Sequence, residues 1–239
     1  MHKPKAGLIG NGKWGSIIRQ KLEKNSKLLF TANSKTLYLQ KLKFIDWVFI
    51  ATPDQTHFSL VKKMIKKKKN IFCEKPLTLN YKKSKFLFSL ASKNKVKLYV
   101  DNIQSFHTKK IKLSKNNYIT RQKKGSGNSK YLLYRFAYHD FYYLYDYLKN
   151  KKLKSIKIED KKKNLKFKLT YNDLSVFNFY YSLNSNKKIH MINQKSFLTK
   201  KDLLSIMIKA VMNNKVNFVK NQKQSLFANQ LIDKIQKKL

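Results

Sequence analysis

The stretch Ala6-Gly7-Leu8-Ile9-Gly10-Asn11-Gly12-Lys13-Trp14-Gly15 decides the fold. A short apolar run leads into three glycines spaced G-x-G-x-x-G, and a helical pattern follows. In this context Gly10 permits the tight turn, Gly12 leaves the backbone open to a pyrophosphate, and Gly15 lets the helix lie close to the strand. Unpaired N–H groups at the helix start face the anion. The motif predicts a dinucleotide site at Gly10, Asn11, Gly12, Lys13, Trp14 and Gly15.

The composition allows one large domain or two small ones, because 42% of the 239 residues are hydrophobic. The formal net charge of +42 by itself favours a protein that binds nucleic acid or a membrane surface. The charge is nearly all lysine and is spread along the chain, whereas base and phosphate recognition favours arginine. We therefore interpret the lysines as solvated faces and expect no specific nucleic-acid partner.

Cys73 is the only cysteine, which excludes an intramolecular disulfide. Residues 1–5 are followed by no adequate signal-peptide core, and no stretch approaches the ~18 uninterrupted apolar residues of a membrane helix. We expect a soluble cytoplasmic protein without membrane insertion. The histidines lie far apart and Cys73 has no partner cysteine, so we expect no metal site.

Strand and helix patterns alternate over the first hundred residues. This spacing predicts right-handed βαβ units and a parallel sheet, whose ligands lie at the carboxyl ends of the strands. The connection before Asp46 is short, so one strand–helix pair is expected to be reduced or lost. The predicted strands are 5–9, 28–32, 46–51, 70–73 and 98–100, with helices at 13–24, after residue 54 and at 80–93. We expect one site from Gly10–Gly15, Ser34, Thr52–Asp54, Glu74–Pro76 and Asp101–Asn102, which end these strands.

The end of the second strand bears on which nicotinamide cofactor is used. NAD-preferring sites carry Asp or Glu there to bind the ribose hydroxyls. This chain has Asn33-Ser34-Lys35, and a hydroxyl followed by a cation suits a 2′-phosphate. We therefore favour NADP over NAD, with Ser34 and Lys35 as contacts. A polar turn that contacts nothing is the alternative.

Two further motifs are Ile50-Ala51-Thr52-Pro53-Asp54-Gln55-Thr56-His57-Phe58 and Cys73-Glu74-Lys75-Pro76-Leu77. Together with the glycine turn they resemble the Gfo/Idh/MocA oxidoreductases over residues 5–110, as a shortened member. The resemblance implies an α/β fold: a Rossmann doubly wound parallel sheet at 1–105, and a smaller α+β domain with an open, mostly antiparallel sheet at 106–239. The C-terminal helix is expected to pack back on the first domain. The expected further cofactor contacts are Ala51, Thr52, Pro53, His57, Glu74, Lys75, Pro76 and Asn102.

The resemblance also implies the catalytic residues. Lys75 matches the E-K-P lysine that lies beside the nicotinamide and the substrate. His139 matches the acid/base histidine of the family's D-x-x-x-H-D segment, and Arg135 stands where that segment has its first acidic residue. This departure puts activity or substrate type in question, because a cation there suits an anionic substrate group. For His139, a histidine satisfied by backbone at a helix start is the alternative.

The remaining residues are expected to form a loop, a sheet and helices. Residues 109–130 are polar and are expected to form a loop or linker. Alternating strands are expected at 155–159, 165–171, 176–182 and 188–192, and helices at 139–149, 200–213 and 222–238. In the resembling family the open sheet face often serves as an oligomer interface, which makes a homo-oligomer through this sheet a further expectation.

These observations together predict an NAD(P)-dependent oxidoreductase. It would transfer hydride between the nicotinamide and a hydroxyl or keto group of a sugar or nucleotide-sugar, with Lys75, Arg135 and His139 at the substrate. The alternative is a catalytically impaired nucleotide-binding relative that acts as a sensor or partner subunit.

Overall fold

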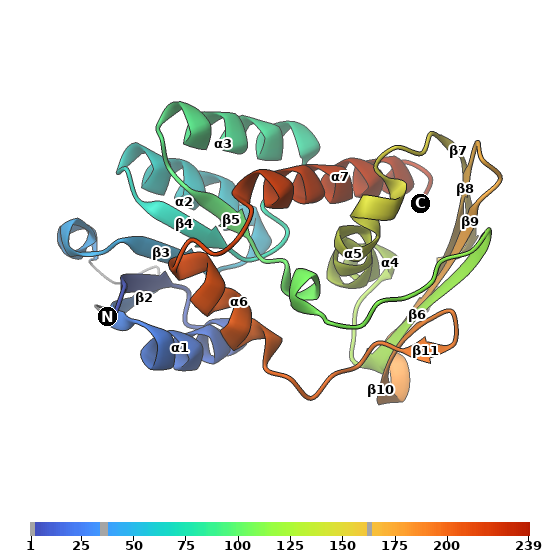
Figure 1. Cartoon of the computed structure of the whole chain (residues 1–239), viewed down its shortest axis with the longest axis horizontal. Helices are drawn as coiled ribbons and strands as arrows, with labels where there is room; N and C mark the ends of the chain where they lie inside the picture. Colours follow the sequence, from blue (N-terminus) through green and yellow to red (C-terminus); the bar gives the residue numbers. More distant parts are fainter. Residues whose placement is uncertain (1–2, 34–37, 162–163) are drawn as a thin grey trace. The chain divides into compact units, whose positions relative to one another are not determined.

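The computed structural model describes residues 3–33, 38–161 and 164–239, and the chain divides into two compact units (Figure 1). Unit 1 comprises Met1–Phe106 and Asp202–Asn229, and unit 2 comprises His107–Lys201 and Gln230–Leu239. From the sequence, residues 106–239 were expected to form the second domain, with the C-terminal helix packing back on the first domain. The structure instead groups residues 202–229 with unit 1.

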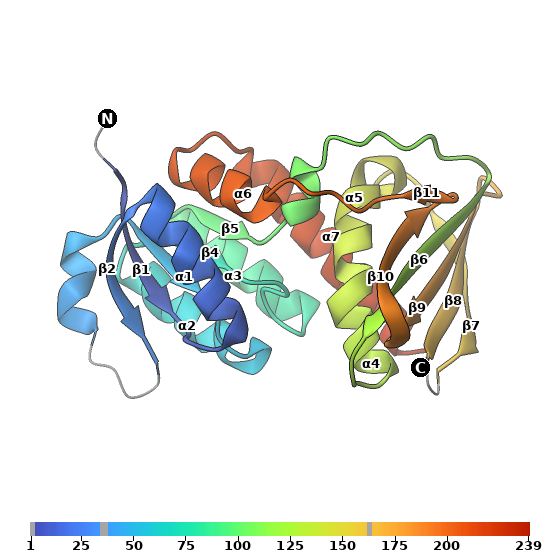
Figure 2. The same ribbon diagram turned by 90° about the horizontal axis from the view of Figure 1, so that it is seen from below.

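The sheet of unit 1 is parallel throughout, in the order β2-β1-β3-β4-β5 (Figure 2). Strands β1, β3, β4 and β5 are almost continuously buried, as expected where helices cover both faces, whereas the edge strand β2 is partly exposed. The expected Rossmann-type parallel sheet is confirmed. The bounds are β1 Lys5–Ile9, β2 Lys27–Ala32, β3 Trp47–Ile50, β4 Asn70–Cys73 and β5 Leu98–Val100.

The expected loss of one strand–helix pair is visible between β2 and β3. The described residues of that connection hold a 3₁₀ helix, η1 (Leu39–Phe44), and no strand. The usual doubly wound order is 3-2-1-4-5-6, and deleting its outermost strand leaves the order seen here. The deletion removes an edge strand, so the strand ends at the centre of the sheet keep their places.

Aromatic rings stack across the centre of this sheet. The ring centroids of Phe49 and Phe72 lie 4.8 Å apart, and those of Phe72 and Tyr99 lie 5.9 Å apart. All three side chains are buried. Such pairs add about 0.5–1.5 kcal/mol each beyond the burial of their area, so they stabilise the packing of β3, β4 and β5.

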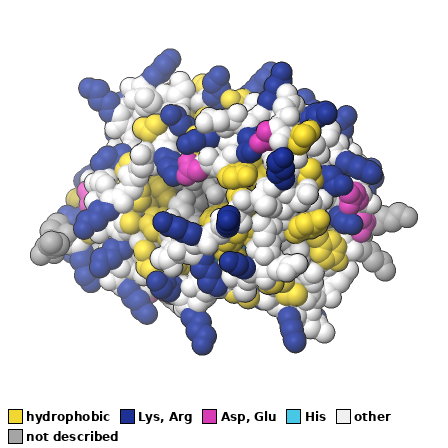
Figure 3. All heavy atoms as spheres, turned by 45° about the vertical axis from the view of Figure 1, so that its right-hand side comes forward, with side chains coloured by type: hydrophobic (Ala, Val, Ile, Leu, Met, Phe, Trp, Pro, Cys, Tyr) yellow, Lys and Arg dark blue, Asp and Glu magenta, His cyan; other side chains and the backbone are white. Residues whose placement is uncertain are grey.

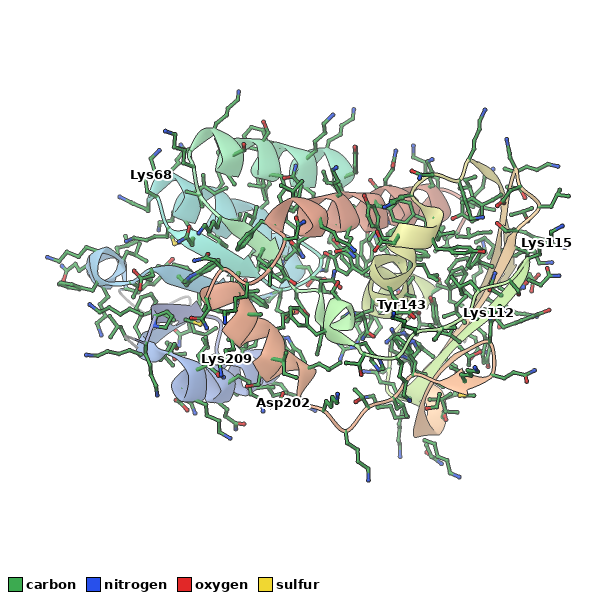
Figure 4. The ribbon with its side chains drawn as sticks, in the orientation of Figure 1. Lys68, Lys112, Lys115, Tyr143, Asp202 and Lys209 are labelled. Atoms are coloured by element: carbon green, nitrogen blue, oxygen red, sulfur yellow. The ribbon has the colours of Figure 1, made fainter. Side chains whose placement is uncertain are left out.

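Helix α6 joins unit 1 because its apolar stripe packs on α1. Met207 and Ile208 of α6 share a buried cluster with Ile18 and Leu22 of α1. Asp202 caps α6 by accepting the Ser205 N–H at 3.1 Å (Figure 4). These contacts account for the grouping of residues 202–229 with unit 1. The helices of unit 1 are α1 Lys13–Asn25, α2 Asp54–Lys66, α3 Tyr81–Lys93, η2 Ile103–Phe106, α6 Leu203–Met212 and the first part of α7 Phe218–Gln236.

Unit 2 is built on a six-stranded mixed sheet in the order β11-β10-β6-β9-β8-β7 (Figure 1). Only the β6–β9 pair is parallel among the described pairs, which confirms the expected, mostly antiparallel sheet. The bounds are β6 Asn116–Lys124, β7 Leu153–Asp160, β8 Asn164–Tyr171, β9 Val176–Ser182, β10 Asn184–Ile192 and β11 Lys195–Ser196.

The expectation that residues 109–130 form a loop or linker is wrong, because β6 lies within them, between β10 and β9. Asn117 and Ile119 are the buried positions of β6, and because one of these two is polar, the strand lacks an apolar signature. The Asn117 side chain donates to the Ser114 carbonyl at 2.7 Å and accepts the Ser114 N–H at 3.0 Å. These bonds satisfy a buried amide that the sequence pattern counts against a strand.

Aromatic side chains form the core between this sheet and its helices. Phe167 stacks on Phe179 with centroids 4.7 Å apart, and Phe141 of α5 meets Phe179 edge-on at 5.5 Å. The chain enters α5 through a π-helical turn. The helical elements here are α4 Ser129–Leu132, the π-turn η3 Leu133–Ala137 and α5 Tyr138–Leu148.

The surface is dominated by cations. Figure 3 shows Lys and Arg side chains spread over the face in view, with few acidic ones between them. This distribution agrees with the interpretation of the lysines as solvated faces. Among the described helices, none combines the length and the apolar character that crossing a membrane requires.

Candidate active site

Gly10 and Gly15 shape the turn between β1 and α1. Gly10 has φ of +118°, and a Cβ at this position would lie 2.3 Å from the Ala51 carbonyl oxygen. A Cβ at Gly15 would lie 2.2 Å from the Gly10 carbonyl oxygen. Both distances are shorter than any real Cβ contact. Glycine is therefore required for the turn at one position and for the close approach of α1 at the other.

Gly12 is a glycine for a different reason. Apart from Gly12 itself and its chain neighbours, the described structure has no heavy atom within 4 Å of the place where its Cβ would lie. Gly12 is also the N-cap of α1, and among the described side chains none caps this helix end. The first turn contains the exposed Lys13 and no acidic residue. Open space beside bare amide groups at a positive helix end is a cradle that a diphosphate fills.

The turn after β3 lies directly against this cradle. The Ala51 N–H donates to the Ile9 carbonyl at 2.8 Å, and Pro53 is the N-cap of α2. The Thr52 hydroxyl accepts a hydrogen bond from Thr56 at 2.7 Å, which fixes the first turn of α2. Ala51, Thr52 and Pro53, which the sequence suggested as cofactor contacts, thus border the glycine turn.

His57 is fully buried behind that turn. Its Nδ1 lies 2.8 Å from the Pro76 carbonyl oxygen, and its Nε2 lies 2.9 Å from the Thr52 carbonyl oxygen. The ring therefore connects the turn after β3 to the turn after β4. Because both ring nitrogens face backbone carbonyl oxygens, we propose that His57 holds these two turns in place and does not contact a ligand.

Glu74, Lys75 and Pro76 follow β4, and the Lys75–Pro76 peptide is cis. Glu74 is buried, and its Oε1 accepts a hydrogen bond from the indole Nε1 of Trp14 in the glycine turn. Its Oε2 accepts the Lys75 N–H at 3.3 Å. Glu74 thus ties α1 to the end of β4, and Lys75 is partly buried at the same strand end.

Asp101 and Asn102 follow β5 and are both buried. Asp101 accepts the Ile103 N–H at 3.0 Å, and the Asn102 amide donates to Gln224 of α7 at 2.9 Å. Burial raises the pKa of Asp101 to about 6, against the lowering effect of Lys75. Burial, together with the charge of Asp101, raises the pKa of Glu74 well above its usual value.

The strand ends of unit 1 therefore bring together the glycine turn, residues 51–53, Glu74, Lys75 and Asp101. Ser34 and Lys35, the expected ribose-end contacts, lie outside the described residues. His139 and Arg135 belong to unit 2. The role of Asp101 as a partner of Glu74 was missed from sequence, although its place at a strand end was recognised.

In unit 2, His139 lies in the first turn of α5 and Arg135 in the π-turn before it. Arg135 is exposed, and its guanidinium lies over the Tyr131 ring at 5.6 Å. Single π-turns inside helices are common at functional sites, because they reposition side chains. His139 is partly buried.

Asp140, next to His139, is a fully buried carboxylate that sequence reasoning did not single out. It accepts hydrogen bonds from Arg121, from the Tyr181 hydroxyl at 2.9 Å and from His190 Nε2 at 3.1 Å. Although burial acts to raise the pKa of Asp140, Arg121 and His190 hold it down at about 2. Arg121 could have been singled out from the sequence, because arginine is rare in this lysine-rich chain.

Comparison with known proteins agrees with this picture. Residues 7–102 match the Gfo/Idh/MocA family, described as an oxidoreductase family with an NAD-binding Rossmann fold. An uncharacterized oxidoreductase of Streptococcus pneumoniae serotype 4 is 26% identical over 120 residues. That match covers 43% of this chain and 33% of the relative's length, so the chain spans about a third of the curated relative it matches.

Solved structures extend the likeness over both units. The UDP-N-acetylglucosamine 3-dehydrogenase GnnA from Acidithiobacillus ferrooxidans is similar with a TM-score of 0.80 and 18% identity, covering 98% of each chain. An NAD-binding protein from Listeria innocua is similar with a TM-score of 0.77 and 12% identity, covering 99% of this chain and 97% of its own. At these identities the likeness shows the fold.

Proposed function

We propose that this chain, whose residues 7–102 match the NAD-binding domain of the Gfo/Idh/MocA oxidoreductase family, transfers hydride between a nicotinamide cofactor and a hydroxyl or keto carbon of a sugar or nucleotide-sugar. The observation that carries the proposal is the open cradle at Gly12, which faces bare amide groups at the start of α1. Beside it, the same sheet edge carries Lys75.

The residues present fit a dinucleotide. The amides of the first turn of α1 would hold the diphosphate, with Asn11, Lys13 and Trp14 beside it. Residues 51–53 would border the ligand on the β3 side, and Glu74 to Pro76 on the β4 side. When bound, the nicotinamide accepts or supplies the hydride. The protein would bind this group, orient it and move the accompanying proton.

Lys75 and His139 are the residues we propose for that proton chemistry. The Lys75 ammonium would hold the substrate oxygen and favour its ionised form as hydride leaves. His139 would exchange the proton, because histidine titrates near neutrality. Asn102, being buried and bonded to Gln224, would act by supporting the strand end.

A sugar-type substrate is supported by the likeness to GnnA, which is a dehydrogenase of UDP-N-acetylglucosamine. For the cofactor we keep NADP ahead of NAD on the sequence Ser34-Lys35 alone. Parallel titrations with NADPH and NADH decide between the two, and equal or tighter binding of NADH would reverse the preference.

The second candidate function is a nucleotide-binding sensor or partner subunit without catalysis. Arg135 favours it, because a cation replaces the acidic residue of the resembling family's motif. The same cation would otherwise suit a substrate that carries phosphate or carboxylate.

We also propose that the open face of the unit 2 sheet pairs two copies of the chain. Tyr118 on this face is 60% exposed beside a depression of about 260 Å³ that Tyr180 and Lys168 also line. Light scattering after size exclusion tests this, and a monomer at every concentration would exclude it.

Turnover with a panel of sugars and nucleotide-sugars tests the main proposal. We expect activity that is lost in Lys75→Ala and in His139→Ala and kept in Lys85→Ala, which removes an exposed lysine of α3. Nucleotide binding without turnover on any substrate, including anionic ones, would instead support the sensor.

A further inference from the structure

Two carboxyl groups, those of Glu74 and Asp101, meet at adjacent strand ends beneath the candidate site. Cys73 and Val100 are paired in register, so the residues that follow them stand side by side. Glu74 is 7% exposed and Asp101 is 1% exposed. The two carboxyl groups act on each other: contact with the Glu74 side chain lowers the pKa of Asp101, as a hydrogen bond from a protonated carboxyl would. A hydrogen bond between two carboxyl groups requires that one of them carry a proton.

Each carboxyl also has its own fixed donors. Glu74 accepts the indole N–H of Trp14 and the backbone N–H of Lys75. Asp101 accepts the Ile103 N–H at 3.0 Å. The Lys75 ammonium acts on both carboxyls and favours their ionised forms. The pair is therefore held from α1, from β4 and from the turn after β5.

The other titratable groups of unit 1 near the pair add little charge. Burial raises the pKa of Cys73, with Glu74 and then the charges of Asp54, at the start of α2, and of Asp101 adding to it. Burial and the charge of Asp101 raise the pKa of Tyr99, so the Cys73 thiol and the Tyr99 hydroxyl both stay neutral. Unit 1 thus places two buried carboxyls against the ammonium of Lys75. Two ionised carboxylates in one buried site repel each other, and one shared proton removes this repulsion.

We propose that Glu74 and Asp101 hold one proton between them and together act as a single negative counter-charge for the Lys75 ammonium. Glu74 is the proton donor of the pair and Asp101 is the carboxylate. Both are positioning residues that act through Lys75. The consequence for catalysis rests on the function proposed above, whereas the shared proton rests on the geometry of unit 1.

Infrared spectroscopy of the protein without nucleotide tests the shared proton. At neutral pH we expect the carbonyl band of one protonated, buried carboxyl group. Glu74→Gln should remove this band, because glutamine keeps the hydrogen bonds to Trp14 and Asp101 but has no carboxyl. Glu23→Gln, at an exposed acid of α1, should keep it. A wild-type spectrum without the band, or a band that persists in Glu74→Gln, would overturn the proposal.

Turnover tests the shared counter-charge. Glu74→Gln leaves the Asp101 carboxylate, Asp101→Asn leaves the Glu74 carboxylate, and only the double variant removes both. We expect each single variant to lower turnover a few-fold, and the double variant to lower it by about tenfold more than the product of the single effects. If the loss of turnover in the double variant equals the product of the losses in the two single variants, the shared role is contradicted.

Lys75→Met separates this inference from the proposed function. It should abolish turnover and leave the infrared band in place, since the two carboxyls remain together. If no variant and no substrate gives turnover, the proposed function fails while the band still decides the shared proton. If turnover is found and the band is absent, the shared proton fails alone.

Discussion

Arg121 and Asp140 form a bidentate ion pair, in which Nε of Arg121 lies 2.9 Å from Oδ2 of Asp140 and Nη2 lies 2.6 Å from Oδ1. The Tyr181 hydroxyl and His190 Nε2 donate to the same carboxylate. Strands β6, β9 and β10 thereby converge on the first turn of α5, which carries His139. The pair fixes the place of the proposed acid/base residue within unit 2.

Removing the guanidinium should destabilise unit 2 strongly. In Arg121→Met the Asp140 carboxylate remains buried without its cation, which typically costs about 3–5 kcal/mol. The free energy of unfolding in urea measures this loss. Arg19→Met is the matched control, because Arg19 pairs with Glu23 on the surface of α1 and such pairs are worth about 0.2–1 kcal/mol. Equal losses in the two variants would contradict the central role of the buried pair.

Asp140 should also set an acid limit on stability. Its folded pKa of about 2 lies below the usual Asp value of 3.8, so the folded state gains stability from this group above pH ~4. That gain is lost as the pH falls from ~4 towards ~2. Asp140→Asn should lack this component, so the stability difference between wild type and variant should shrink across this range in unfolding curves. A constant difference would argue against the pair.

His57 should stabilise unit 1 through its two carbonyl contacts. His57→Leu removes the ring nitrogens that face the Thr52 and Pro76 carbonyls, and a buried carbonyl that loses the N–H donated by the ring costs about 1–3 kcal/mol. Phe58→Leu, at the neighbouring and partly exposed position of α2, should cost less. Thermal unfolding of both variants measures the difference. A His57→Leu variant as stable as the wild type would show that the two turns hold without the ring.

The glycines of the first turn should divide into structural and functional positions. Gly15→Ala places a methyl group 2.2 Å from the Gly10 carbonyl oxygen and should cost about 1–3 kcal/mol as the backbone shifts. Gly12→Ala meets no neighbouring atom within 4 Å of the added Cβ and should cost less, about 0.5 kcal/mol, because alanine is a poorer N-cap than glycine. Chemical unfolding distinguishes these cases, and a Gly12→Ala variant as unstable as Gly15→Ala would refute the open cradle.

Much of unit 1 was predictable, because its signals are local. Continuous apolar runs marked the buried parallel strands, and the spacing of Gly10, Gly12 and Gly15 marked the turn. The pairing of Glu74 with Asp101 was not predictable, because it depends on the register of β4 and β5 across 27 residues of sequence.

Unit 2 was harder to predict from the sequence, for two physical reasons. Strand β6 is central, yet its inward position Asn117 is polar and satisfied only by contacts of the folded state. In the sequence, Asp140 was only the last residue of the segment that resembles D-x-x-x-H-D, with no role assigned to it. Its importance comes from Arg121, Tyr181 and His190, which reach it from three strands that are distant in sequence.

Nucleotide binding tests the central claim most directly. Tryptophan fluorescence is the readout, because Trp14 stands in the glycine turn and the other tryptophan, Trp47, is buried in the core of unit 1. Titration with NADPH and NADH should show saturable binding of at least one nucleotide below millimolar concentration, and binding to the folded Gly12→Ala variant should be about tenfold weaker or worse. Failure of both nucleotides to bind the wild type, or equal binding by Gly12→Ala, would contradict the account.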